Sequence, residues 1–243
     1  MPYHIDRKLV VGVSSSALFD LQVEDTIFRE DGVDAYKKYQ EAHKTKTLEK
    51  GVAFPFIRRF LNINNIFPEQ EPVEVVVLSK NSPETGIRTF NSIKDHCLNI
   101  SRAAFTSGSS AVDYIPAYNI SLFLSTDFDD VLHAIRKNFP AGRILPTDIH
   151  DDVEDNELRV AFDFDGVLAD DEAEKIYSDA EQLELFHQHE VDNVSKPLSP
   201  GLLMEFIKKL AYFQKLEKKR ADKDPEYEKI LKTDRKSTRV NSS

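Results

Sequence analysis

Apolar residues along this chain fall into short runs that alternate with longer amphipathic segments. Five short runs predict strands at residues 9–13, 73–78, 101–106, 120–124 and 142–146, and the run at 73–78 is rich in β-branched residues. The segments between them carry apolar residues at helical spacing and predict helices at 24–47, 54–67, 83–96 and after Asp127. Strands that alternate with helices in this way predict an α/β fold, Rossmann-like, with a mostly parallel sheet flanked by helices.

Three segments of different composition follow residue 146. Residues 147–157 are acidic and predict a linker that separates an α/β half at 1–146 from a second half at 158–233. The second half has too few predicted strands and reads as the incomplete start of another α/β unit. Residues 234–243 resemble a translated sequencing adapter, so we expect a non-native read-through tail and a natural protein that continues past Thr233.

An acid pair follows the apolar run that opens the second half. Asp163 and Asp165 are separated by one residue, and Gly166 comes next. The run predicts a buried parallel strand, and residues two apart on a strand point the same way, so both carboxylates can reach one ligand at its carboxyl end. Two carboxylates this close favour a divalent cation such as Mg²⁺. The pair suits phosphoryl transfer, with Asp163 as nucleophile and Asp165 as acid and base.

Three other interpretations of the acid pair compete with phosphoryl transfer. An EF-hand loop fails, because a glycine is needed at position 6 and Gly166 stands at position 4 counted from Asp163. A plain Asp-Gly turn does not explain an acid at Asp163 directly after a buried strand. A structural or vestigial metal clip remains as the alternative.

The segment around the acid pair repeats the beginning of the chain. Residues 158–167 align with 9–18, and residues 201–211 align with 51–61, at offsets of 149 and 150 residues. Two short matches at nearly one offset predict two related halves. Ser14 and Ser16 stand where Asp163 and Asp165 stand, and a serine replaces a carboxylate poorly as a Mg²⁺ ligand. The first half is therefore expected to lack its own acid pair and to supply substrate contacts.

Composition excludes several classes of protein. The formal net charge of −10, without a long basic stripe, argues against a nonspecific nucleic-acid binder. No apolar run approaches the roughly 20 residues of a membrane span, so no membrane contact is expected. Cys97 is the single cysteine, which excludes an intrachain disulfide and favours a cytoplasmic setting. The oligomeric state is left open by the sequence.

An ordered set of motifs resembles one family. They are VSSSALF at 13–19, AFPF at 53–56, VLSKN at 77–81, NSI at 91–93, FLS at 123–125, LRVAFD at 158–163, and a segment at 193–201. Together they cover most of residues 8–215 and resemble the cytosolic type I 5′-nucleotidases, which belong to the haloacid-dehalogenase-like phosphatases. The resemblance implies Mg²⁺-dependent removal of the 5′-phosphate from nucleoside monophosphates such as AMP, through an aspartyl-phosphate on Asp163. Ser14, Ser16, Ser79 and Asn81 are the expected substrate contacts.

The chain departs from the family pattern at two places. Pro116 stands where members carry a lysine, so an anion contact is expected to be missing. The second half also stops before the strands that should supply a phosphate-binding hydroxyl, a lysine and a further acidic pair. We therefore expect this chain to be weak or inactive. The alternative is a non-catalytic module that binds nucleotides or another protein, with the first half as its functional part.

Overall fold

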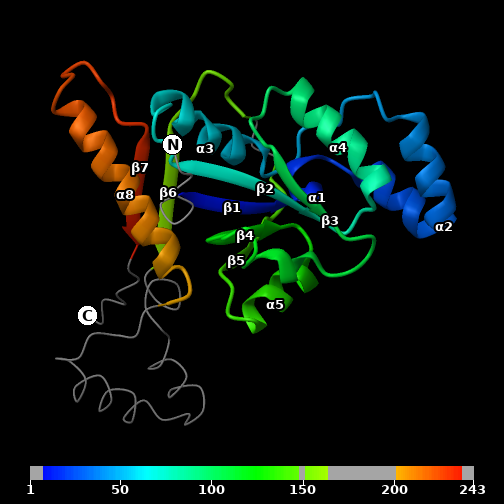
Figure 1. The fold of residues 1–243 in the computed structure, drawn as a ribbon. Coiled ribbons are helices and arrows are strands. Elements are labelled where there is room, and N and C mark those ends of the chain that lie inside the picture. Colours follow the sequence, from blue (N-terminus) through cyan, green and yellow to red (C-terminus); the bar gives the residue numbers. More distant parts are fainter. Residues whose placement is uncertain (1–7, 148–150, 164–200, 237–243) are drawn as a thin grey trace, which may run out of the picture. The chain divides into compact units, whose positions relative to one another are not determined.

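The computed structural model of the chain describes residues 8–147, 151–163 and 201–236 (Figure 1). The chain divides into two compact units, Met1–Leu158 and Arg159–Ser243. Within the described residues, no helix is both long enough and apolar enough to cross a membrane. Each unit has its own strands and its own buried side chains.

The first unit is built on a five-stranded sheet in the order β3-β2-β1-β4-β5. Every neighbouring pair of its strands is parallel, which confirms the predicted α/β class. The central strand β1 is buried at all six positions, as expected for a parallel strand covered on both faces. The strands are β1 Leu9–Ser14, β2 Val73–Ser79, β3 Arg102–Phe105, β4 Leu122–Ser125 and β5 Ala141–Arg143.

Helices follow the strands as the sequence predicts, and local signals mark their ends. Ser82 caps α4 by accepting a bond from the Thr85 N–H at 3.4 Å, and Pro83 occupies its first position. Asp127 caps α5 by accepting from the N–H groups of Asp129 and Asp130. The helices are α1 Ser15–Leu18, α2 Gln22–Ala42, α3 Phe54–Ile66, α4 Pro83–Asp95 and α5 Phe128–Arg136, with a 3₁₀ turn η2 at Ala111–Tyr114.

Three details differ from the sequence predictions. Helix α2 ends at Ala42 instead of residue 47 and is broken at Gly32, whose φ of +84° is not helical. Strand β5 ends at Arg143 instead of Pro146: the Ile144 N–H makes one more bond, to the Ser125 carbonyl at 2.8 Å, and Pro146 has no N–H with which to extend the ladder. The apolar spacing after Asp127 predicts a buried stripe that includes Ile135, but Ile135 is 40% exposed and Ala134 is buried in its place.

The core of the first unit lies around the three central strands. Its fully buried members include Val10, Val76 and Phe123 from the sheet. Helix α3 adds Phe54, Ile57 and Phe60, all at most 1% exposed, so the Phe54-Pro55-Phe56 motif contributes mainly to packing. The glycine before α3, Gly51, lies against the α1 backbone, where a Cβ atom would come within 2.6 Å of the Ala17 carbonyl oxygen.

Residues 151–157, which the sequence predicts as a linker, are held by two arginines of α3. Arg58 donates to the carbonyl oxygens of Asp152 and Asp155 at 3.1 and 2.9 Å. Arg59 donates to the carbonyl of Asp155 at 2.9 Å and pairs with the Asp151 carboxylate at 2.8 Å. This acidic segment is therefore packed as part of the first unit.

The second unit contains the two-stranded sheet of β6, Leu158–Asp163, and β7, Leu231–Lys236, together with α8, Met204–Ala221. Helix α8 buries Phe206, Leu210 and Phe213, a spacing of four and three residues that forms one face. The described strand β7 includes the first three residues of the segment expected to be a read-through tail.

The internal repeat seen in the sequence is also present in local structure. Strands β1 and β6 each span six residues, and their bounds are offset by 149 positions. At the start of α3 the Phe54 N–H donates to the Gly51 carbonyl at 3.0 Å, and at the start of α8 the Met204 N–H donates to the Gly201 carbonyl at 3.0 Å. The same turn thus precedes both helices, which supports a duplication.

Candidate functional site

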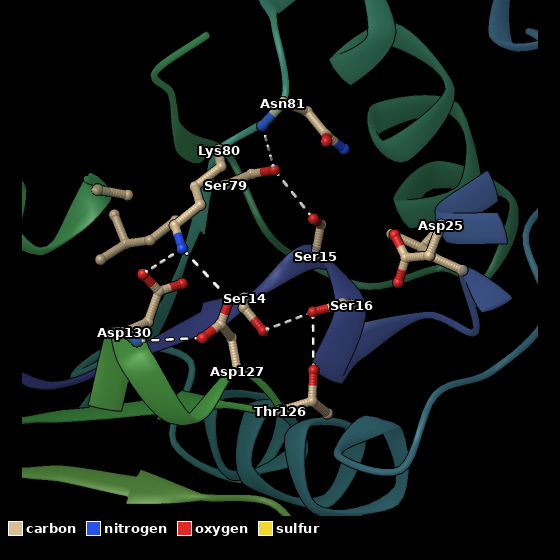
Figure 2. A pocket seen from close by; sticks show the side chains of 13 residues that line it. Ser14, Ser15, Ser16, Asp25, Ser79, Lys80, Asn81, Thr126, Asp127 and Asp130 are labelled. Atoms are coloured by element: carbon tan, nitrogen blue, oxygen red, sulfur yellow. Dashed lines mark hydrogen bonds and ion pairs between the residues drawn. The ribbon is translucent and has the colours of Figure 1, made fainter. Parts of the chain in front are cut away.

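A pocket of about 360 Å³ opens at the carboxyl ends of β1 and β2 (Figure 2). The chain passes from β1 to β2 and β3 on one side, and then returns to β4 on the other side of β1. A parallel sheet binds ligands at such a reversal of strand order, because the connections diverge and leave a crevice there. Most of the lining side chains are polar: Ser14, Ser15, Ser16, Asp25, Ser79, Lys80, Asn81, Thr126, Asp127 and Asp130.

Three hydroxyl groups form a chain across one wall of the pocket. The Oγ atoms of Ser14 and Ser16 lie 3.2 Å apart, and Ser16 Oγ lies 2.8 Å from Thr126 Oγ1 (Figure 2). Ser14 Oγ also accepts the N–H of Ala17 at 3.1 Å, because Ser14 caps the short helix α1. This chain links the end of β1 to the residue that follows β4.

Two further hydroxyl groups meet on the opposite side of β1. The Oγ atoms of Ser15 and Ser79 lie 2.9 Å apart, and Ser79 Oγ accepts the N–H of Asn81 at 3.2 Å. Both serines are buried, at 6% and 4% exposure. The turn that follows β3 uses its N–H groups internally, since Ser107 and Gly108 donate to the carbonyls of Asn81 and Lys80 at 3.1 and 2.7 Å. These two N–H groups of the Ser107–Ser110 loop are therefore already bonded to main-chain carbonyls, as in an ordinary turn.

Among the described residues that line the pocket, Lys80 is the one cation, and it is paired with two carboxylates. Lys80 Nζ lies 2.7 Å from Asp130 Oδ1 and 3.2 Å from Asp127 Oδ2. Burial acts to lower the pKa of Lys80, but the hydrogen bonds and charges of Asp130 and Asp127 outweigh it and leave that pKa above its usual value. Burial acts to raise the pKa of Asp127, but the bonds from the Asp130 amide and Lys80 outweigh it and lower that pKa. Burial, with a contribution from Glu24, raises the pKa of Asp25.

The structure brings together Ser14, Ser16, Ser79 and Asn81, which were predicted as substrate contacts from separate segments. Their role as contacts stays a prediction. Sequence reasoning missed Ser15, Lys80 and the acidic pair Asp127 and Asp130. A signal was available for three of them, because Ser15 and Lys80 come directly after β1 and β2, and Asp127 caps the helix that follows β4. Asp130 lies in the first turn of α5.

The predicted acid pair lies in the second unit. Asp163 is the last residue of β6, as the sequence predicts for a strand-end carboxylate. Asp165 lies outside the described residues, so the pairing of the two stays a prediction. Within the part of the chain that the structure describes, no group of three or more histidine, cysteine or acidic side chains is arranged to hold a metal ion.

The pocket of the first unit has no activated serine or thiol among its described residues. None of the residues that line it there is a histidine or a cysteine, and no hydrogen bond joins one of its serines to a carboxylate. Its charged residues, one lysine and three aspartates, carry a formal net charge of −2. Its chemistry is therefore hydrogen bonding by hydroxyls and carboxylates.

Comparison with known proteins gives one family. A family model described as 5′-nucleotidase matches residues 1–241. Human cytosolic 5′-nucleotidase 1B is 30% identical over 212 residues, an alignment that covers 85% of this chain and 35% of that protein. The chain thus spans about a third of the length of this relative. No solved structure matches the chain.

Proposed function

This chain belongs to the 5′-nucleotidase family, and from that premise we propose that it carries the nucleophile of a phosphatase acting on nucleoside 5′-monophosphates such as AMP. The reaction is hydrolysis to a nucleoside and inorganic phosphate, in the cytoplasm. The residues proposed to carry it are Asp163 and Asp165. The substrate, the metal and the covalent intermediate are all parts of this proposal.

One observation carries the proposal, namely that β6 ends at Asp163. A carboxylate at the carboxyl end of a strand stands where α/β proteins bind ligands. The equivalent end of β1 in the first unit, Ser14, lines a pocket, which supports the same use of the strand end in the second unit. Serine at that position leaves the end of β1 without a carboxylate nucleophile, so the reaction is assigned to the second unit.

The chemistry follows from the two carboxyl groups. A carboxylate oxygen of Asp163 attacks phosphorus, and the bond between phosphorus and the nucleoside O5′ breaks. Asp165, protonated at that moment, gives its proton to the leaving oxygen. Asp165 then takes a proton from water, which attacks phosphorus, breaks the aspartyl-phosphate bond and regenerates Asp163.

The donor set fits a divalent cation. Carboxylate oxygens are the ligands that Mg²⁺ prefers, and two acids one residue apart repel each other without a cation between them. Asp163 and Asp165 would hold the ion, and when bound it would supply positive charge toward the phosphoryl oxygens.

The test is phosphate release from AMP in Mg²⁺, measured for this chain, its Asp163→Asn variant and a Glu228→Gln control. Glu228 is an exposed acid of the same unit. The same aspartate substitution is made in a full-length family member, because this chain is expected to be the slower of the two. We expect Asp163→Asn to reduce release at least 100-fold in any chain that shows activity, as loss of a nucleophile does, and Glu228→Gln to leave it unchanged.

A second readout tests the intermediate directly. Borohydride reduces an aspartyl-phosphate to homoserine, so mass spectrometry after mixing with AMP should find the change at residue 163 and at no other aspartate. Release that is unaffected by Asp163→Asn, or a full-length member that is inactive on every nucleoside monophosphate, would overturn the proposal.

A further inference from the structure

We propose that the pocket of the first unit binds a neutral polyhydroxylated ligand, with the ribose of an unphosphorylated nucleoside as the ligand to test, and that it rejects phosphate. All the residues concerned belong to the first unit, so the proposal is independent of hydrolysis at Asp163. It assigns a class of ligand to Ser14, Ser16 and Ser79, which the sequence predicts as substrate contacts.

Counting hydrogen bonds shows unused donors on the pocket wall. Ser14, Ser16 and Thr126 have three O–H groups but only two bonds among their oxygens. The Ser14 oxygen is the acceptor in its bond with the Ala17 amide, so that bond does not use the Ser14 O–H. Among the contacts of the described residues, one O–H of these three hydroxyl groups is therefore available to a ligand.

The second hydroxyl pair gives the same result. Ser15 and Ser79 share one bond between two O–H groups, so another donor is left over. These serines are more than nine-tenths buried, and their oxygens are hydrogen-bond partners of each other. A ligand that accepts from both sides of β1 would give the remaining O–H groups their acceptors.

Carboxylates supply the complementary acceptors. Asp127 and Asp130 each contact Lys80 through one oxygen, and Asp25 lines another part of the pocket (Figure 2). An ionised carboxylate only accepts, so its natural ligand partners are O–H and N–H groups. Hydroxyl donors and carboxylate acceptors in one pocket suit a ligand whose own groups both donate and accept, as vicinal hydroxyls do. The volume of about 360 Å³ lies within the range of small-molecule sites.

The same pocket is unsuited to phosphate. Its net charge is negative, and Lys80 is already held by two carboxylates. Three amides beside the pocket are already bonded, since those of Ala17, Asn81 and Asp127 donate to serine hydroxyls at 3.1, 3.2 and 3.1 Å. A phosphate dianion would therefore meet a net negative charge, with neutral hydroxyls but no free lysine to offset it.

The test is isothermal titration of the full Asp163→Asn chain in EDTA, which removes hydrolysis from the measurement. The ligands are adenosine, 2′,3′-dideoxyadenosine, AMP and inorganic phosphate. We expect adenosine to bind, dideoxyadenosine to bind at least tenfold more weakly, and inorganic phosphate to show no binding. Three results would overturn the proposal. They are equal affinity for adenosine and dideoxyadenosine, stronger binding of phosphate than of adenosine, and no detectable binding of adenosine added at 10-fold the protein concentration.

Two variants and a control locate the site. Thr126→Val keeps the shape but removes one hydroxyl, and we expect a roughly 3- to 10-fold loss of adenosine affinity, the effect of one neutral hydrogen bond. Asp130→Asn releases Lys80 from its closer partner, so adenosine should weaken while phosphate binding is gained. Thr26→Val, at an exposed position of α2, should change neither affinity. An adenosine affinity that neither pocket substitution changes, in folded protein, would also overturn the proposal.

Discussion

A buried acid in the second unit illustrates how a single residue can organise its surroundings. Glu217 on α8 is 1% exposed. One of its carboxylate oxygens accepts from the Tyr227 hydroxyl at 2.9 Å and from the Ile230 N–H at 2.7 Å. The Leu231 N–H lies 3.4 Å from both oxygens. Buried carboxylates persist only where donors surround them, so this residue ties the end of α8 to the beginning of β7.

The Glu217→Ala substitution tests that role at the residue scale. It leaves two main-chain N–H groups and a hydroxyl without their acceptor, and each unpaired donor costs about 1–3 kcal/mol. We expect the free energy of unfolding to fall by about 3 kcal/mol, measured by urea denaturation followed by circular dichroism. Glu205→Ala is the control, because Glu205 forms only an exposed pair with Lys208. A loss as small as that of the control would contradict the role.

Alkaline pH should weaken the same cluster. Burial, with the hydrogen bond and charge of Glu217, raises the pKa of Tyr227 above its usual value. The folded state thus keeps the phenolic proton more tightly than the unfolded chain does, and stability from this group is lost as pH rises above about 10.

At the scale of an element, the beginning of α5 combines a helix cap with part of the pocket. Asp127 accepts from the N–H groups of Asp129 and Asp130 at 2.8 and 3.2 Å, and it also contacts Lys80. The charged carboxylate is favoured there by the helix N-terminus and by the lysine. The cap of α5 and the charge balance of the pocket therefore depend on one ionisation.

This coupling predicts a pH dependence on the acid side. Because the folded-state pKa of Asp127 lies below its unfolded value, its contribution to stability is present above about pH 4 and is lost as pH falls further. We expect urea denaturation between pH 3 and 7 to show a shallower acid decline for Asp127→Asn, which keeps a capping side chain, than for the unsubstituted chain. Identical declines in the two proteins would show that this carboxylate contributes nothing.

At the scale of the whole molecule, each unit has its own large buried side chains. Phe60 in the first unit is fully buried, and Phe213 in the second is 1% exposed. Truncating either phenylalanine removes about 3–5 kcal/mol of packing free energy from the unit that contains it.

The two units are expected to unfold in separable transitions. In scanning calorimetry, Phe60→Ala should lower the midpoint of one transition and Phe213→Ala that of the other. Exposed Phe128→Ala is the control and should shift neither by a comparable amount. A single transition that both core substitutions lower equally would contradict independent units.

The internal repeat is the basis for assigning different functions to the two units. The same strand and the same helix-initiating turn occur in both units, but β1 ends in Ser14 and β6 ends in Asp163. A hydroxyl suits ligand binding, while a carboxylate suits a metal ion and nucleophilic attack on phosphorus. The proposed functions of the two units follow from this one difference in side-chain chemistry.

The sequence by itself determined which elements form. Apolar runs and helix caps are local signals, so strands β1–β4 and helices α3–α5 lie close to their predicted positions. It also identified Ser14, Ser79 and Asp163 as strand-end residues. Its errors were local too: Gly32 breaks α2, and Ile135 faces solvent, because periodicity alone does not fix which side of a short helix meets the sheet.

Tertiary structure decided which of these residues share a pocket. The strand order places β1 between β2 and β4, and only this arrangement brings Ser16 to Thr126 across 110 residues of sequence. It also decided that Lys80 is neutralised by Asp127 and Asp130, which changes the expected ligand from an anion to a neutral polyol. Charges and hydrogen bonds act through space, and their partners here come from distant segments whose proximity no local pattern encodes.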